Sequence, residues 1–459
     1  LFKGDLLGLS ATNAMELGVD VGGLDAVIMN GYPGTISSFF QQAGRAGRGT
    51  RDGMAIMVAH DDPLEQFLIR KPQMILQGVV ESVAANPSNP QILSQQLLCA
   101  AHERPIAPSE LERFGPNAID VAETLDRAGE LAFRAGMFFY PSHEPPAPNV
   151  NIRGSGGEQV HLVVENEVLG SMERWRAMQH AHAGAVYLHR GQSFVVQSLN
   201  LDIGRAELIP HETNHYTTPI VQSVIEQNVV LRSESDTPNP KLQTPNSAFQ
   251  NPKSKIQNRV SLVGVSVTST VTGFRRKTLD GDHVLSVEPL EMPETTFDTL
   301  AVRFDLPPSG IEDDQEALIG SIHGLEHALM AVAPLIAGCD RADLGSSWYT
   351  AFPDFGSRMS DVGFGTEQER PRDQPSIINH QSSGFLPAVF IYDQTPGGVG
   401  LCEKLYANLG SWVMAAYQLL STCDCPEGCP ACLMSSRCEA NNESLNKRGA
   451  LAHLETLSP

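Results

Sequence analysis

The 459-residue sequence lacks features that would place it in a membrane, outside the cell or on a broad nucleic-acid surface. It shows no run of about 18 apolar residues, the length that a membrane helix needs, and no N-terminal export signal. Its eight cysteines are too few for a disulfide scaffold. A formal net charge of −21 argues against a broad basic surface and leaves room for local contacts by a few arginines and backbone amides.

An initiator methionine is also absent from the chain start. The first residues, LFKGDLLGLSATNA, have the apolar run of a buried strand. We therefore expect the chain to be the C-terminal part of a longer protein. A hydrophobic content of 41% can build sizeable cores, and the length indicates about three domains.

Hydrophobic patterning predicts a multidomain α/β fold class. Residues 1–72 alternate buried-strand runs, LLGLSAT, AVIMNGY and MAIMVAH, with helical segments, as in part of a parallel sheet with helices on its faces. Residues 73–145 are predicted to form helices followed by a hairpin, the order of a winged-helix module, with one helix capped by Asn89 and carrying Pro90 at its first position. Residues 146–292 are β-rich, with alternation in VHLVVENEV and AVYLHRGQSFVVQSLNL and a polar insertion at about 228–258 that we expect to be disordered. Residues 293–459 are predicted to form a second α/β unit that ends in a cysteine cluster.

Two arginines stand out near the chain start, in the stretch QQAGRAGRG. Arg45 and Arg48 lie three residues apart with glycine and alanine between them, so both guanidinium groups can meet one phosphate chain. The small residues allow tight turns and close approach. Taken alone, the pattern is equally typical of a surface turn with solvated arginines.

The sequence upstream changes the interpretation of these arginines. ATNAMELGVDVGGLDAVIMNGYPGTISSFFQQAGRAGR resembles motifs V and VI of superfamily-2 helicases, which lie in the second RecA-like domain of those ATPases. The resemblance implies that Arg45 and Arg48 are catalytic and stabilise charge on the ATP γ-phosphate. It implies that the nucleotide is contacted by Gly18, Asp20, Gln41, Arg45 and Arg48. Thr12 and Asn13 would face the nucleic-acid strand.

Other parts of a complete ATPase are missing from the sequence. It contains no G-x-x-x-x-G-K-[ST] phosphate loop and no DExH or DEAD run to hold Mg²⁺. In this family those parts belong to the first RecA-like domain, which we expect to precede residue 1. ATP with Mg²⁺ would then be bound mainly outside this chain, and we predict that the chain alone hydrolyses no ATP.

Five of the eight cysteines lie within TCDCPEGCPACLMSSRC, with the spacing C-x-C-x3-C-x2-C-x5-C. The C-x2-C pair is the bite of a zinc knuckle. A tetrahedral site takes four thiolates, so one of the five is spare. We expect one structural zinc ion held by Cys425, Cys429, Cys432 and Cys438, with Cys423 as the alternative to Cys425. Without a metal, the cluster would be a set of free buried thiols or a redox centre.

Four further stretches make the family resemblance specific: HGLEHALMAVAPL, CDRADLG, FIYDQTPGGVGL and CDCPEGCPACLMSSRCEANNESLNK. In this order they resemble the zinc-binding domain of MrfA-type DNA-repair helicases. The resemblance covers nearly the whole chain and implies an ATP-dependent DNA helicase that translocates 3′ to 5′ in DNA repair. It implies a DNA partner that is single-stranded or has a single-stranded tail, and a cytoplasmic, nucleoid-associated protein.

A different function is suggested by His323, Glu326 and His327, which spell H-x-x-E-H. This is the inverzincin metallopeptidase pattern, in which two histidines one helical turn apart bind zinc and the glutamate activates water. Glu403 is a candidate third ligand. The simpler interpretation is a packed or hydrogen-bonded histidine pair on a helix with one apolar face.

A third interpretation is a non-catalytic DNA-binding or adaptor fragment. The stretch FRRK, residues 274–277, places an aromatic ring beside three cations, a combination that suits contact with a strand backbone. Four such residues are more commonly found in a solvated turn.

Overall fold

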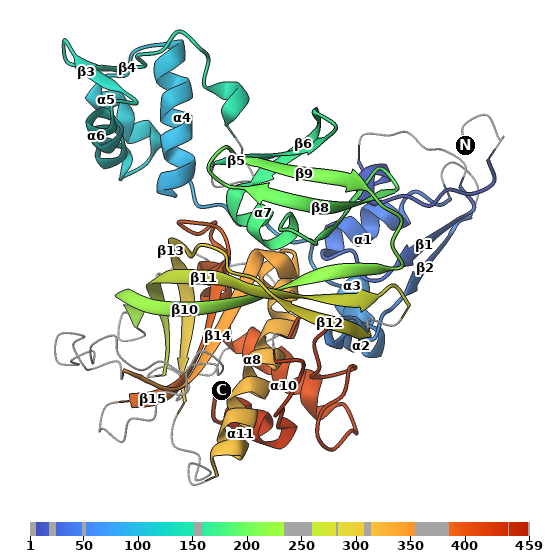
Figure 1. The fold of residues 1–459 in the computed structure, drawn as a ribbon. Coiled ribbons are helices and arrows are strands. Elements are labelled where there is room, and N and C mark those ends of the chain that lie inside the picture. The colour runs from blue at the N-terminus through green and yellow to red at the C-terminus, as the bar shows by residue number, and fades with distance from the viewer. Residues whose placement is uncertain are drawn as a thin grey trace.

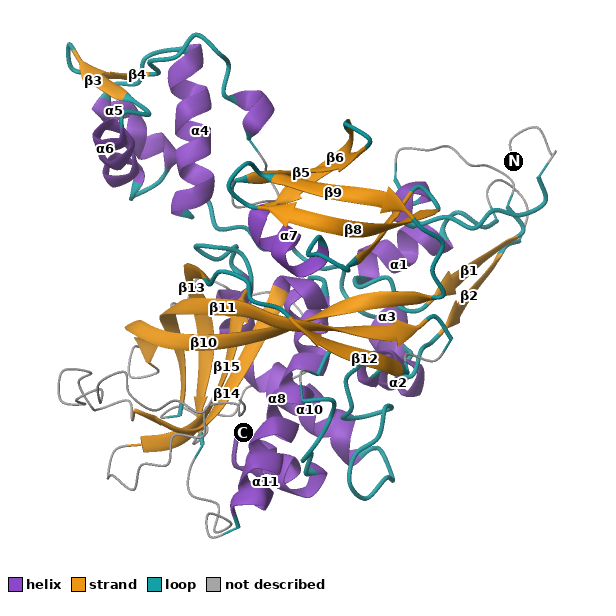
Figure 2. Ribbon diagram, in the orientation of Figure 1, coloured by secondary structure: helices purple, strands orange, loops and turns teal. Residues whose placement is uncertain are grey.

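The structure is a computed structural model. It consists mainly of two large sheets, a separate helical segment and a group of C-terminal helices (Figure 1). Its mixed helices and strands confirm the multidomain α/β fold class (Figure 2). The structure describes residues 6–17, 24–47, 52–150, 158–233, 259–280, 283–306, 314–353, 385–438 and 440–457.

A two-stranded parallel sheet and short helices form the N-terminal region. Its elements are the 3-10 helix η1 (Asn13–Met15), β1 (Ala26–Asn30), α1 (Ile36–Ala43), β2 (Met54–Val58), α2 (Pro63–Arg70) and α3 (Gln73–Leu76). Strands β1 and β2 coincide with the apolar runs AVIMNGY and MAIMVAH, which confirms both predictions. The prediction of a strand at LLGLSAT was wrong, because residues 6–12 are exposed coil that no described strand pairs with.

A helical segment followed by a hairpin comes next, in the predicted order. Its elements are α4 (Pro90–Glu103), α5 (Pro108–Leu111), η2 (Glu112–Phe114), α6 (Ala118–Ala128), β3 (Ala132–Arg134) and β4 (Met137–Phe139). Helix α4 begins as predicted, because Asn89 Oδ1 accepts from the backbone N–H of Gln91 at 2.8 Å and Pro90 occupies the first turn. The segment has its own hydrophobic core and stands apart from the sheets in Figure 1.

A five-stranded sheet occupies residues 159–210, in the order β6-β5-β9-β8-β7. Its elements are β5 (Gln159–Val164), β6 (Glu167–Glu173), α7 (Arg174–His180), β7 (Val186–His189), β8 (Gln192–Asn200) and β9 (Arg205–Pro210). The β5–β6 and β7–β8 hairpins match the predicted stretches VHLVVENEV and AVYLHRGQSFVVQSLNL. Helix α7 contributes Ala177 to the core of this sheet.

A larger sheet of six strands runs in the order β10-β11-β13-β15-β14, with β12 also paired to β11. Its strands are β10 (His215–Ser233), β11 (Val260–Thr278), β12 (Val284–Pro289), β13 (Thr295–Asp305), β14 (Leu344–Pro353) and β15 (Phe385–Asp393). The sheet therefore crosses the expected boundary between residues 292 and 293. Of the expected polar insertion, residues 228–233 continue β10, and residues 234–258 lie outside the described residues.

The FRRK stretch lies within β11 and not in a turn, so the solvated-turn interpretation was wrong. Phe274 is buried, with its ring centroid 4.5 Å from that of His182. Arg276 Nε lies 2.8 Å from Glu288 Oε1 on the neighbouring strand. Phe274 therefore packs against the segment between α7 and β7, and Arg276 pairs with a residue within its own sheet.

One face of the six-stranded sheet is covered by α8 (Gln315–Ala337), α9 (Leu401–Ala407), α10 (Leu409–Ser421) and α11 (Lys447–Leu457). Helix α8 packs against α10, α11 and β14, so every residue from Gly320 to Met330 is buried. The sequence predicted only one buried apolar face for this helix, and the buried surface in the structure is wider than that. By length and composition α8 could cross a membrane, contrary to the sequence expectation, but 78% of its apolar window is buried in this core. The stretch GLCEKLYANLGSWVMAAYQLL, residues 400–420, is predicted from its sequence to form one helix, but the structure divides it at Asn408 into α9 and α10.

Candidate functional site

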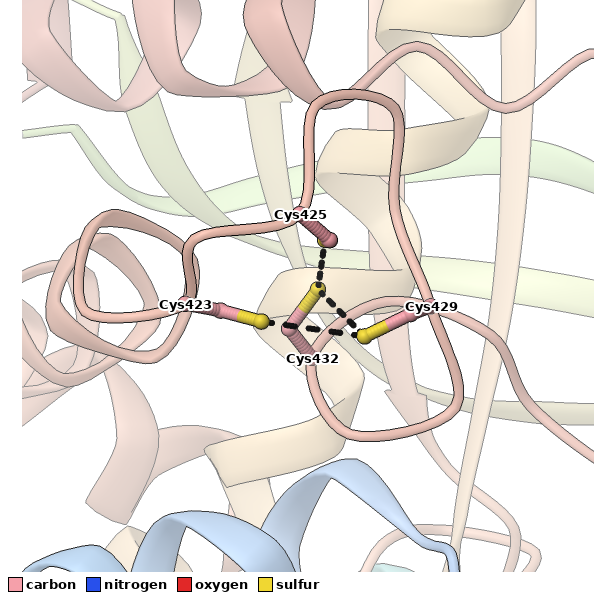
Figure 3. Close-up of side chains that lie close together, drawn as sticks. All are labelled: Cys423, Cys425, Cys429 and Cys432. Atoms are coloured by element: carbon pink, nitrogen blue, oxygen red, sulfur yellow. Dashed lines mark hydrogen bonds between the residues drawn. The ribbon is translucent and has the colours of Figure 1, made fainter.

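Four cysteine side chains converge in the loop that follows α10 (Figure 3). Sγ–Sγ distances are 3.6 Å between Cys423 and Cys429, 3.4 Å between Cys425 and Cys432, and 3.8 Å between Cys429 and Cys432. Thiolates bound tetrahedrally to one zinc ion at about 2.3 Å lie about 3.8 Å from each other, whereas disulfide sulfurs lie about 2.05 Å apart. These four thiols, hereafter the four-cysteine group, therefore fit a closed zinc site.

The loop takes its shape from a knuckle turn after Cys429. The carbonyl of Cys429 accepts from the backbone N–H of Cys432 at 3.0 Å and of Leu433 at 2.9 Å. Gly428 has φ +119°, and a Cβ at this position would lie 2.9 Å from Leu433 Cδ2, so only glycine fits without a shift. Cys432 is fully buried and belongs to the main hydrophobic core together with Leu433. Burial and turn geometry thus bring the donors of the loop together.

A buried lysine supports the four-cysteine group from α11. Lys447 Nζ donates to the carbonyls of Cys423 at 2.6 Å and Cys425 at 2.7 Å, and lies 3.4 Å from Cys425 Sγ. Zinc with four thiolates carries a net charge of −2, so a neighbouring ammonium group offsets part of that charge. Sequence reasoning missed Lys447, because a single lysine in a short helix carries no signal of its long-range contacts.

A second cation connects the N-terminal region to the same loop. Arg70, the last residue of α2, donates through Nη2 to the carbonyl of Ala431 at 2.8 Å. The adjacent Lys71 donates through Nζ to Gln418 Oε1 on α10. The helix that follows the QQAGRAGRG stretch is therefore bonded directly to the four-cysteine loop, a link that nothing in the sequence indicated.

Cys438 lies outside the four-cysteine group, which differs from the expected ligand set. Cys423, which was expected only as an alternative to Cys425, lies beside Cys425, Cys429 and Cys432, so the group contains both residues and not Cys438. After Leu433 the chain runs along α8, and it places Cys438 Sγ 3.3 Å from His323 Nε2. Burial raises the pKa of the Cys438 thiol, but hydrogen bonds with the two histidines of α8 outweigh burial and bring its pKa to about 6.

The H-x-x-E-H residues lie on α8 as predicted, but they do not form a peptidase arrangement. His323 and His327 are grouped with Cys438, and Glu403 is not part of that group. Glu326 Oε1 accepts from Ser346 Oγ on β14, so this carboxylate oxygen is engaged within the core. Among the described residues, the histidine pair is thus a buried structural feature.

The motif V and motif VI segments meet through one glutamate and one arginine. Arg45 Nη2 donates to the carbonyl of Glu16. The Glu16 carboxylate accepts from Ser38 Oγ at 2.6 Å and Gln42 Nε2 at 3.1 Å, so it binds helix α1 directly. Arg45 therefore joins the motif VI segment to the motif V segment.

Of the other residues predicted to contact the nucleotide or the DNA, the structure describes three and leaves three outside the described residues. Gln41 Nε2 donates to Ser37 Oγ at 3.2 Å, and among the described residues no partner satisfies its buried Oε1. Thr12 and Asn13 are exposed at the start of η1, where Thr12 Oγ1 accepts from Ala14 N at 3.4 Å. The other predicted residues lie outside the described residues: Gly18, Asp20 and Arg48.

Helix α1, which contains Gln41 at the start of motif VI, is capped from a distant segment. The Glu81 carboxylate accepts from the backbone N–H groups of Ile36 at 2.5 Å and Ser37 at 3.2 Å. The next residue, Ser82, accepts at its carbonyl from Lys404 Nζ at 3.0 Å. A carboxylate at a helix N-terminus stabilises it, so the linker of residues 81–82 ties motif VI to helix α9.

Comparison with protein families finds three matching family models. Residues 1–50 match the helicase conserved C-terminal domain, residues 85–155 match the winged helix domain of the ATP-dependent helicase HRQ1, and residues 325–433 match the MrfA Zn-binding domain. Their order along the chain agrees with the order of the elements described above.

Comparison with whole proteins gives relatives that are longer than this chain. The uncharacterized ATP-dependent helicase YprA of Bacillus subtilis is 30% identical over 94% of this chain and 52% of its own length. The ATP-dependent helicase hrq1 of Schizosaccharomyces pombe is 28% identical over 100% of this chain and 40% of its own length. The chain thus spans about half the length, or less, of these relatives.

Solved structures agree with the sequence comparisons. The crystal structure of the DUF1998 helicase MrfA bound to DNA aligns with a TM-score of 0.54 and 27% identity, over 97% of this chain and 53% of that chain. A second crystal structure of the DUF1998 helicase MrfA aligns with a TM-score of 0.55 and 25% identity, over 90% of this chain and 52% of that chain. The chain belongs to the MrfA-type superfamily-2 helicases and carries their zinc-binding domain.

Proposed function

We propose that this chain is part of an ATP-dependent DNA helicase that translocates 3′ to 5′ and acts in DNA repair. In this proposal the chain supplies motifs V and VI and a structural zinc domain. The family comparisons and the bonded junction between Glu16 and Arg45 support the proposal. The relevant DNA is single-stranded or has a single-stranded tail, and the protein works in the cytoplasm at the nucleoid.

The observation that carries the proposal is the contact between motif V and motif VI. ATP with Mg²⁺, when bound, supplies the phosphoanhydride bond whose hydrolysis drives movement. Arg45 is positioned by the Glu16 carbonyl, and Gln41 presents a buried Oε1 that no described residue satisfies. We place Arg45, Arg48, Gln41, Gly18 and Asp20 at the nucleotide. A displacement of the motif VI helix would be passed through Glu16 to motif V, and so to a strand held by Thr12 and Asn13.

The small parallel sheet supplies independent support. Parallel sheets are normally covered on both faces. Here Ile28 on β1 is 68% exposed, and Met54 and Val58 on β2 are 57% and 51% exposed. Such a row of exposed apolar side chains needs a cover, which further RecA-like structure in the whole protein would provide.

The four-cysteine group serves a structural role in this proposal. Zinc is the metal of the matched domain, and we assign its ligands as Cys423, Cys425, Cys429 and Cys432. A closed set of four thiolates leaves no position for substrate or water, so the ion stabilises the loop and takes no part in hydrolysis. Through the Arg70–Ala431 contact the loop then steadies the helix that follows motif VI.

The experiment that tests the proposal measures DNA-stimulated ATP hydrolysis by the full-length protein. The Arg45→Ala variant is compared with wild type and with Arg205→Ala, a control arginine that pairs with Glu207 in the five-stranded sheet. We expect Arg45→Ala to lower the rate by about 10³-fold, the lower end of arginine-finger effects, and Arg205→Ala to leave it unchanged. A wild-type rate in Arg45→Ala would refute the assignment.

A further inference from the structure

A second group of metal-binding side chains lies beside the four-cysteine group. The ligand atoms of His323, His327 and Cys438 all lie within 4.8 Å of one another. Cys438 Sγ lies 3.3 Å from His323 Nε2. A nitrogen 2.0 Å and a sulfur 2.3 Å from one tetrahedral zinc ion are about 3.5 Å apart, so this spacing matches shared coordination.

Backbone carbonyls orient both imidazole rings toward Cys438. His323 Nδ1 lies 3.1 Å from the carbonyl of Glu443, and His327 Nδ1 lies 2.8 Å from the carbonyl of Leu433. A carbonyl can only accept, so each Nδ1 carries the proton and each neutral ring has its lone pair on Nε2. Histidines that bind metals show this pattern, in which the second nitrogen donates to a carbonyl and fixes the tautomer.

The contacts of Cys438 Sγ also suit metal binding. The backbone N–H of Asn442 donates to Cys438 Sγ at 3.2 Å and so orients the sulfur. Glu326 Oε2 lies 3.6 Å from His327 Nε2 but is not part of the three-residue group. Its carboxylate and the Cys438 thiolate would together offset the charge of a divalent cation in this buried place.

We propose that His323, His327 and Cys438 bind a second zinc ion, which ties the middle of α8 to the segments 433–438 and 440–443. Two imidazoles and one thiolate are a typical zinc donor set. The site is structural, because both histidines are buried and the Trp348 ring stacks on His323 with centroids 5.6 Å apart. This inference does not depend on helicase activity, and it raises the expected zinc count from one to two.

Metal content of the purified full chain tests the proposal directly. Zinc per chain is measured by mass spectrometry after dialysis against zinc and removal of excess, for wild type, Cys438→Ser and the control Cys99→Ser. We expect two zinc ions in wild type and Cys99→Ser, and one in Cys438→Ser. One zinc in wild type, or two retained in Cys438→Ser, would overturn the proposal.

If Cys438→Ser fails to fold, cobalt substitution tests for the second metal site instead. Cobalt(II) bound to four thiolates and cobalt(II) bound to two imidazoles and a thiolate have different visible absorption bands. We expect wild type to show both spectra, and His327→Gln to lose only the second. A wild-type spectrum that contains the four-thiolate bands alone would contradict a second site.

Discussion

Replacement of Lys447 by methionine is the perturbation whose consequence follows most directly from the zinc loop. Lys447 is 4% exposed and donates to the carbonyls of Cys423 and Cys425 beside a thiolate. Methionine fills a similar volume but donates nothing, so two carbonyls and the charge of the four-cysteine group lose their partner. An unsatisfied buried acceptor costs about 1–3 kcal/mol, and at about 1.5 kcal/mol for each of these partly exposed carbonyls the two together cost about 3 kcal/mol.

That loss should appear in zinc affinity, because the loop and its ion form together. A change of about 3 kcal/mol corresponds to about a hundredfold weaker binding. The assay is competition with a chromophoric chelator at fixed pH, for wild type, Lys447→Met and Arg448→Met. Arg448 is the next residue in α11 and is exposed, so it is the matched control. Affinity within about twofold of wild type in Lys447→Met would refute this account of the loop.

Three further predictions address ATP, the motif VI helix and pH. The isolated chain should show no DNA-stimulated ATP turnover, because its 459 residues contain no phosphate loop, and measurable turnover would contradict this. Glu81→Ala removes the acceptor for the Ile36 and Ser37 amides, so hydrogen exchange in α1 should rise about tenfold relative to the exposed control Glu123→Ala, and equal rates would exclude the cap. Burial raises the pKa of Asp393 to about 6 in the folded chain, so the folded state binds the proton more tightly than the unfolded state. The free energy of unfolding should therefore fall by about 2 kcal/mol as pH rises from about 4 to about 6 in wild type relative to Asp393→Asn, and identical pH profiles in the two proteins would contradict this.

Local signals in the sequence predicted the elements that depend on local chemistry. Asn89 and Pro90 marked the start of α4, and the alternation of apolar residues marked the hairpins. The C-x2-C spacing identified the knuckle turn, because two thiols in one short turn are brought together by the turn itself. These features need no knowledge of distant segments.

The features that the sequence did not predict correctly depend on contacts between distant segments. The membership of the four-cysteine group depended on the path of residues 433–438 and 440–443 along α8, and this path placed Cys438 beside His323. The strand predicted at residues 6–12 also depended on a partner, and no described strand pairs with them. Lys447 was invisible in the sequence for the same reason, since its contacts lie more than twenty residues away.

Strand separation by the full-length protein tests the central claim most directly. Duplexes with a 3′ or a 5′ single-stranded tail are offered with ATP to wild type and to Arg48→Ala. Our account predicts that wild type separates the 3′-tailed duplex and that Arg48→Ala separates neither, because the motif VI arginine is required for hydrolysis. Wild-type strand separation by Arg48→Ala would contradict it.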